Sequence, residues 1–143
     1  MADDDLDLID GIARYLAGLD LLDYDTDGAS GDTFAEFLPP SPGEAVALTL
    51  YGGAEPDSRV PIDEPSLQVR VRGTADPRVS RRRSYRIYSA LHGLTRIALP
   101  DGTWLVLCIG QAPPQAIGVD ANGRHEHVTN YRLTVGAPTM HRP

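Results

Sequence analysis

An abrupt change of hydrophobic period between residues 67 and 93 restricts the possible folds more than any other feature of the sequence. Its first part, "LQVRVRG", alternates strictly between apolar and polar residues, which predicts a strand with one buried face and with Arg70 and Arg72 on the other. The part that follows repeats its apolar residues every three or four positions, as in a helix with one buried side. A strand and a helix in direct succession indicate a sheet that is covered by helices.

Capping residues define both ends of this helix. Asp76 is a good N-cap, Pro77 suits the first helical position, and Gly93 suits the position after the last turn, so we expect a helix from about Pro77 to His92. The side opposite its apolar stripe carries an exposed set of residues, namely Arg81, Tyr85 and Tyr88.

Arg83 is the exception, because it falls within the apolar stripe. Either the helix meets the core only in its second half and its arginine-rich start extends over the edge of the fold, or Arg83 has a buried acidic partner. We favour the first arrangement.

The remaining elements follow from periodicity and turn residues. The segment "LDLIDGIARYLAGLDLL" is an amphipathic helix, and a loop rich in Gly, Pro, Ser and Asp follows it, with a short strand near Phe34 to Leu38. "AVALTLYGG" is a strand, a long exposed loop occupies residues 52–65, and two hairpins turn at "PDGT" and at "DANG". We expect a single α+β domain with a mostly antiparallel, mixed sheet and two helices packed on one face.

Domain limits follow from length and composition. A chain of 143 residues fits one domain, which we place at residues 6–135, between a flexible acidic N-terminus (1–5) and a flexible C-terminal tail (136–143). The longest apolar run, "WLVLCIG", is far shorter than a membrane span, and no membrane partner is expected. Cys108 lies in that run and is interpreted as a small buried hydrophobic residue.

Charge is distributed unevenly along the chain. The net charge is −7, yet residues 1–64 carry −14 and residues 65–143 carry +7. Opposite charges on two surfaces of one subunit suit head-to-tail association of identical copies.

Catalytic and metal-binding patterns receive little support. His125 and His127 point to the same face of one strand with Asp120 nearby, but a third ligand is not evident, and we interpret them as part of a surface or interface strand. There is no phosphate-binding loop or nucleophile elbow, and we expect no cofactor, no metal and no enzymatic activity. The "RRRSYR" segment mixes arginine with tyrosine, as proteins that bind single-stranded nucleic acid do. Arg and Tyr are also enriched at protein interfaces, and we favour a protein interface for this segment.

Several segments, taken in order, resemble the tail terminators, the minor capsid protein family of long-tailed phages. These are the N-terminal amphipathic helix, "SLQVRVRG", "IYSALHGL", "IALPDGTWLVLCIG" and "QAIGVDANGRHEHVTNYRLTV". The resemblance covers most of residues 6–135 and includes the Arg-Gly that ends the central strand and the Gly-Arg and Asn-Tyr of the last strand.

The resemblance implies a structural protein that forms a homohexameric ring at the head-proximal end of the tail tube, in the neck of the virion, after assembly in the host cytoplasm. Its partners would be other copies of itself, the tail tube protein and a head-completion or stopper protein, while genomic DNA passes through the lumen without specific binding. The alternatives are another neck component, such as a stopper or adaptor, and a nucleic-acid-binding protein.

Two groups of residues are the candidate contact sites. For the subunit, neck or tube interface we expect Arg70, Arg72, Arg81, Arg82, Tyr85, Arg86 and Tyr88. The resemblance directs the long loop towards the tube or the lumen, with Glu55, Asp57, Arg59, Asp63 and Glu64. Because carboxylates repel phosphates, we expect charge reversal of Asp57, Asp63 and Glu64 to slow genome ejection.

Overall fold

A computed structural model describes residues 6–143 of the chain, so the predicted flexible N-terminus (1–5) lies outside the described residues. The elements in chain order are α1 (Leu8–Gly18), β1 (Thr33–Ala35), β2 (Ala45–Tyr51), β3 (Ile62–Asp63), β4 (Ser66–Arg72), α2 (Pro77–Leu91), β5 (Thr95–Ala98), β6 (Trp104–Gly110), β7 (Gln115–Val119) and β8 (His125–Gly136). Both helices and both hairpins agree with the sequence prediction, and β3 was not predicted.

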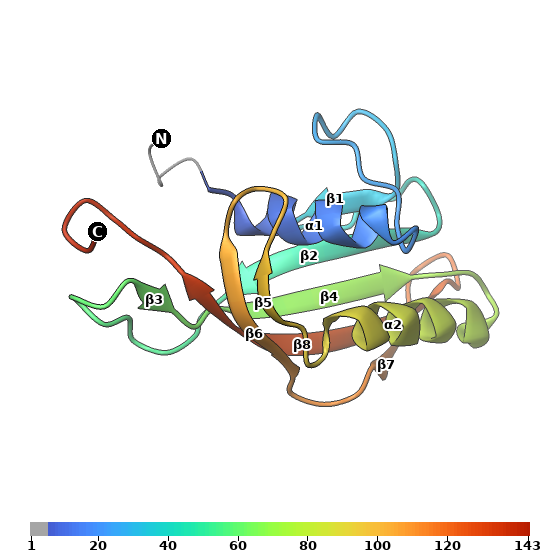
Figure 1. Cartoon of the computed structure of the whole chain (residues 1–143). Coiled ribbons are helices and arrows are strands. Elements are labelled where there is room, and N and C mark those ends of the chain that lie inside the picture. Colours follow the sequence, from blue (N-terminus) through green and yellow to red (C-terminus); the bar gives the residue numbers. More distant parts are fainter. Residues whose placement is uncertain (1–5) are drawn as a thin grey trace.

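One mixed sheet forms the centre of the molecule, with the strand order β1-β2-β4-β8-β6-β5. β1 is parallel to β2, and the other pairs are antiparallel. The long strand β8 pairs with β4 along one edge, and along the other edge it pairs first with β7 and then with β6. Figure 1 shows β8 running diagonally through the sheet.

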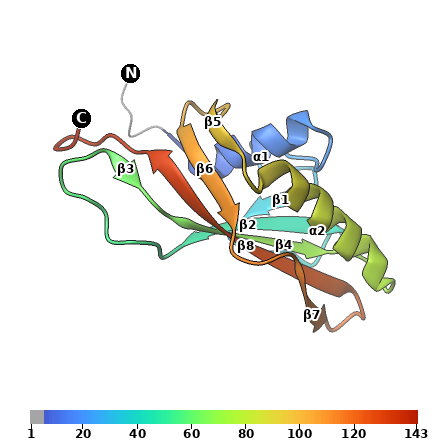
Figure 2. The same cartoon turned by 60° about the horizontal axis from the view of Figure 1, so that its bottom comes forward.

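Both helices lie on one face of this sheet, as predicted (Figures 1 and 2). α1 buries Ile12 and Leu16, α2 buries Ile87 and Leu91, and a single hydrophobic core joins these residues to the apolar face of β2, β4 and β8. In Figure 1, α1 lies over the β1 and β2 side, and α2 lies over β4 and β8. The α+β class with two helices on one face is therefore confirmed.

Capping residues explain where α2 begins and ends. The carboxylate of Asp76 accepts a hydrogen bond from the Arg78 backbone nitrogen, Pro77 occupies the first turn, and Gly93 adopts a φ of 84°, which favours glycine. Cys108 is buried as expected, and burial raises the pKa of its thiol to about 12. None of the helices in the described chain has the length and apolar character of a membrane span.

Candidate functional site

Two serines bring the first half of α2 close to the sheet. Ser80 and Ser84 are buried, and the Ser80 hydroxyl shares a hydrogen bond of 2.8 Å with Nδ1 of His127 on β8. The helix therefore contacts the sheet from Ser80 to Leu91, in both of its halves. The expectation that its arginine-rich start extends beyond the fold is wrong, because small serine side chains replace the missing apolar residues at the contact.

Arg83 has an acidic partner, as the second alternative required. Its Nη2 donates to Asp32 across 2.6 Å, its Nε donates to the Leu21 carbonyl oxygen across 3.3 Å, and both charged side chains are mostly buried. Asp32 also accepts a hydrogen bond from the backbone nitrogen of Asp23. This pair connects α2 to the loop that follows α1.

The outward side of α2 carries charges that have no ion-pair partner in the described part of the chain. Arg81, Arg82 and Arg86 are exposed, and none forms an ion pair within residues 6–143. Tyr85 between them is 46% exposed. We call these four residues the arginine face. Arg78, by contrast, binds the Asp76 carboxylate beside it.

Two of the expected interface arginines have partners inside the protein. Arg72 is 4% exposed and donates to the carbonyl oxygens of Pro39, Pro42 and Gly43, so the expectation that it offers its charge at the sheet surface is wrong. The reason is that the proline-rich segment before β2 folds over this corner of the open sheet face. Arg70 forms an ion pair with Glu126 on the neighbouring strand β8.

Tyr88 is half-buried, whereas the helical wheel placed it on the exposed side. Its ring stacks on His92 at a centroid distance of 5.0 Å and lies close to the buried Tyr131. The end of β6 lies against this side of the helix, since a side chain on Gly110 would collide with the Tyr88 ring. Tyr88 therefore fixes α2 on the sheet.

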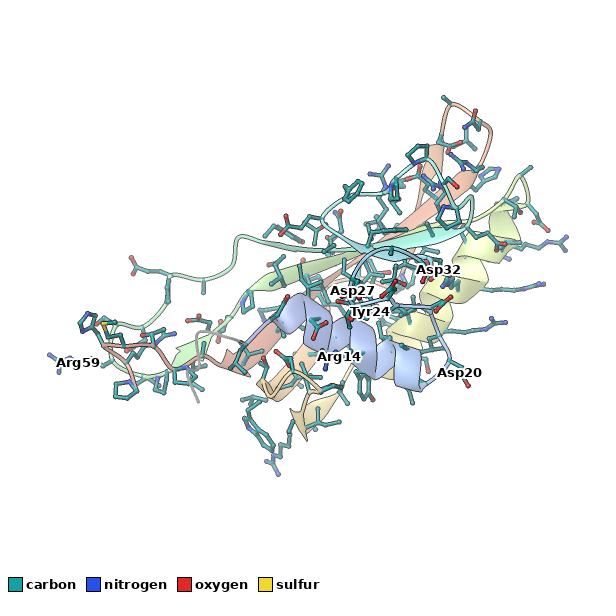
Figure 3. The ribbon with its side chains drawn as sticks, turned by 90° about the horizontal axis from the view of Figure 1, so that it is seen from above. Arg14, Asp20, Tyr24, Asp27, Asp32 and Arg59 are labelled. Atoms are coloured by element: carbon teal, nitrogen blue, oxygen red, sulfur yellow. The ribbon has the colours of Figure 1, made fainter. Side chains whose placement is uncertain are left out.

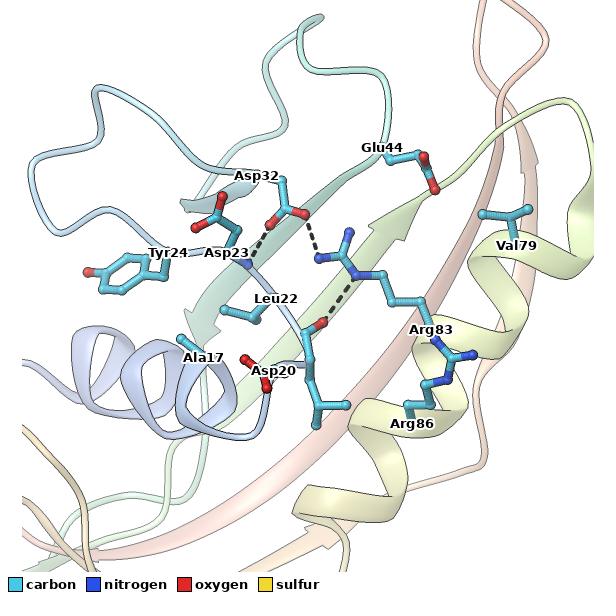
Figure 4. Close-up of a pocket in the computed structure, with 11 residues that line it drawn as sticks. Ala17, Asp20, Leu22, Asp23, Tyr24, Asp32, Glu44, Val79, Arg83 and Arg86 are labelled. Atoms are coloured by element: carbon cyan, nitrogen blue, oxygen red, sulfur yellow. Dashed lines mark hydrogen bonds and ion pairs between the residues drawn. The ribbon is translucent and has the colours of Figure 1, made fainter.

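Four exposed carboxylates lie on the loop after α1 and directly before β2. None of them has a cation partner in the described chain. We call them the acidic rim: Asp20, Asp23, Asp27 and Glu44. A cleft of about 610 Å³ separates three of them, Asp20, Asp23 and Glu44, from Arg83 and Arg86 of α2. Figure 4 shows the Arg83–Asp32 pair crossing this cleft.

The long loop between β2 and β4 projects from the body with the C-terminal tail beside it, and Figure 3 shows Arg59 far from the labelled residues of the acidic rim. Glu55, Arg59 and Glu64 are exposed. Asp57 instead accepts hydrogen bonds of 2.7 Å from the backbone nitrogens of Arg59 and Val60, and these bonds lower its pKa. Asp57 therefore stabilises a turn within the loop.

Arg142 connects the tail to this loop. It is 6% exposed, its Nη1 lies 2.9 Å from Oδ1 of Asp63, and it donates to the carbonyl oxygens of Asp57 and Ala137. The predicted flexibility of residues 136–143 stays a prediction, but the described tail has this defined contact.

The histidines of β8 lie in different surroundings. His127 is buried against α2, and burial, followed by the charges of Arg81 and His125, lowers its pKa. Within residues 6–143, no group of three or more His, Cys, Asp or Glu side chains is arranged to hold a metal ion.

Comparison with known proteins yields one family. The family model described as "Bacteriophage tail terminator protein" matches residues 15–136, from within α1 to the last residue of β8. No curated protein matches the chain.

Proposed function

The chain belongs to the bacteriophage tail terminator family, and from this premise we propose that its copies close a homohexameric ring on the head-proximal end of the tail tube. The ring ends tube polymerisation and offers a surface to a head-completion or stopper protein in the neck. The family assigns a structural role in the virion, and the proposed work of the protein is binding, with no reaction and no cofactor. DNA passes through the ring without specific contacts.

The observation that carries this proposal is the extent of the family match, which includes all eight strands and α2. A closed ring of identical copies needs two different surfaces on each copy, because each copy meets one neighbour on either side. The arginine face and the acidic rim offer such a pair. They are opposite in charge and belong to different parts of the fold: the arginine face to α2, and the acidic rim to the loop after α1 and the residue before β2.

A tube-growth assay tests the proposal. Purified protein added to polymerising tail tube protein is expected to shorten the tubes and to appear as a cap at one end in negative-stain images. A triple variant with Arg81→Glu, Arg82→Glu and Arg86→Glu is expected to stay folded, as shown by circular dichroism, and to lose capping. Tubes of unchanged length with wild-type protein would contradict a terminator role, and binding to the head-side connector alone would assign another neck component.

A nucleic-acid role is the second candidate, because three exposed arginines and Tyr85 share one face of α2. It predicts DNA binding at physiological salt that weakens steeply as salt rises. The terminator role predicts almost no such binding, so a titration of labelled DNA separates the two.

A further inference from the structure

The arginine face needs a partner from outside the subunit. Arg82 and Arg86 are one helical turn apart, and like charges at this spacing destabilise a helix. The two neighbouring arginines with partners, Arg78 and Arg83, bind Asp76 and Asp32. The arginine face thus concentrates three positive charges in a protein whose net charge is −7, and none of the three has an ion-pair partner among residues 6–143.

The acidic rim is the complementary surface on the same chain. Asp23 and Asp27 are exposed, and neither forms an ion pair in the described residues. Their loop is well defined, since the Asp25 carboxylate accepts hydrogen bonds from the backbone nitrogens of Asp27 and Ser30 and from the Ser30 hydroxyl. Carboxylates on an ordered loop lose little conformational entropy when they bind a partner.

Within residues 6–143, no ion pair joins the arginine face to the acidic rim. In Figure 1 the loop with Asp23 and Asp27 rises above α1 on the β1 side of the sheet, whereas α2 lies on the β8 side. Figure 4 shows that Arg86 borders the cleft that also contacts Asp23, while Arg81 and Arg82 are not among the residues that line it. Arg81 and Arg82 are therefore available to a neighbour.

We propose that the arginine face of one copy, through Arg81 and Arg82, docks on the acidic rim of the next copy, at Asp23 and Asp27. This inference rests on the proposed ring and names the partner of the arginine face as a second copy of this chain rather than a head-side protein. Guanidinium–carboxylate pairs that lose water at such a contact fix the orientation of neighbouring subunits. Tyr85, beside Arg81 and Arg82, adds apolar area to the same contact.

Charge exchange between copies tests the contact. Variant A carries Arg81→Glu and Arg82→Glu, and variant B carries Asp23→Arg and Asp27→Arg. Each is expected to remain a monomer by analytical ultracentrifugation and to fail to cap tubes, because like charges then meet at every contact. A chain with all four changes is expected to assemble again, with the same net charge as the wild type.

An equimolar mixture of A and B is also expected to assemble. In an alternating ring, the glutamates of A meet the arginines of B at one contact, and the next contact is the wild-type one. Assembly of the mixture could not be explained by attraction between oppositely charged molecules. The wild type has a net charge of −7, and two charge reversals change this to −11 in A and to −3 in B. Both remain negative.

A matched control reverses two exposed arginines that lie on strands instead of α2, Arg96→Glu in β5 and Arg132→Glu in β8. This control has the same net charge as A. This control is expected to assemble as the wild type does. The inference is overturned if A and B each assemble alone, if neither the mixture nor the four-change chain assembles while each remains folded, or if the control fails as A does. If the wild type forms no ring in solution or on tubes, the proposed function itself fails.

Discussion

Burial of His127 between α2 and the sheet makes its protonation unfavourable. The ring bonds to the Ser80 hydroxyl, and besides burial the nearby charges of Arg81 and His125 disfavour a positive charge on it. Its folded-state pKa lies below the ordinary value of 6.5. As the pH falls through 6.5, the unfolded chain therefore takes up a proton that the folded chain resists, and stability decreases.

We predict that a His127→Asn variant loses less stability between pH 7 and pH 5 than the wild type does. Urea unfolding followed by circular dichroism at several pH values measures the difference. His141→Asn, at an exposed position of the tail, is the matched control and is expected to keep the wild-type pH dependence. Equal slopes for the wild type and His127→Asn would show that His127 accepts a proton in the folded state.

Single residues also show what a sequence cannot predict. Arg72 alternates with buried residues and was expected at the surface, but the carbonyl oxygens that bind it come from a segment 29 to 33 positions away in the chain. The partner of Arg83 is 51 positions away. Periodicity gives the direction of a side chain relative to its own element, whereas these partners depend on how irregular loops cross the sheet.

At the scale of elements, small residues form the contact between the start of α2 and the sheet. A side chain on Gly73 would place its Cβ 2.8 Å from the backbone nitrogen of Ser80, a separation that backbone atoms cannot relieve without moving the helix. Ser80 itself is fully buried. The start of α2 is therefore positioned by backbone proximity as well as by the Ser80–His127 hydrogen bond.

We predict that Gly73→Ala destabilises the protein by about 1–3 kcal/mol, the usual cost of forcing an extra carbon into a packed contact. Urea unfolding measures the change. Gly18→Ala is the matched control, because a Cβ at the end of α1 meets nothing within 4 Å, and it is expected to be neutral or to stabilise by up to about 1 kcal/mol. A Gly73→Ala variant as stable as the wild type would show that α2 can move away freely.

The main elements could be predicted because each depends on local signals. Asp76, Pro77 and Gly93 mark the limits of α2, and the alternation of β4 shows which face is buried. The strand β3 could not be predicted, because two residues in a proline-rich loop carry no periodicity and Ile62 and Asp63 pair with the far end of β8.

At the scale of the whole molecule, the long loop and the C-terminal tail form one structure through Arg142. Asp57 stabilises the loop turn and Asp63 pairs with Arg142, so reversing either charge would alter the loop itself. The charge of the loop is better tested at Glu55 and Glu64, which are exposed and have no ion-pair partner in residues 6–143.

We predict that virions with Glu55→Arg and Glu64→Arg assemble but eject their genome more slowly, because arginines on a loop that faces the lumen of the proposed ring would attract passing phosphates. Release of DNA followed with an intercalating dye measures the rate. Glu55→Gln and Glu64→Gln remove the negative charges without adding positive ones and are expected to slow ejection less. An unchanged rate in the arginine variant would remove this loop from the path of the DNA.

The candidate site could be predicted in part. The sequence showed a basic helix and an acidic first half, and the structure adds which charges are free: Arg81, Arg82 and Arg86 have no ion pair within residues 6–143, whereas Arg70, Arg72 and Arg83 have partners. Free and paired arginines look the same in a sequence, because the difference depends on loops that only the tertiary structure brings near.

The course of β8 gives the subunit a mechanical property. Its twelve residues share ladder hydrogen bonds with β4 on one edge and with β7 and β6 on the other, so a pull along the strand is resisted by many bonds in shear at once. Under such a load the hydrogen bonds of β8 must break together, whereas in peeling they would break one after another. In the proposed ring, such a subunit transmits tension between its neighbours without unravelling.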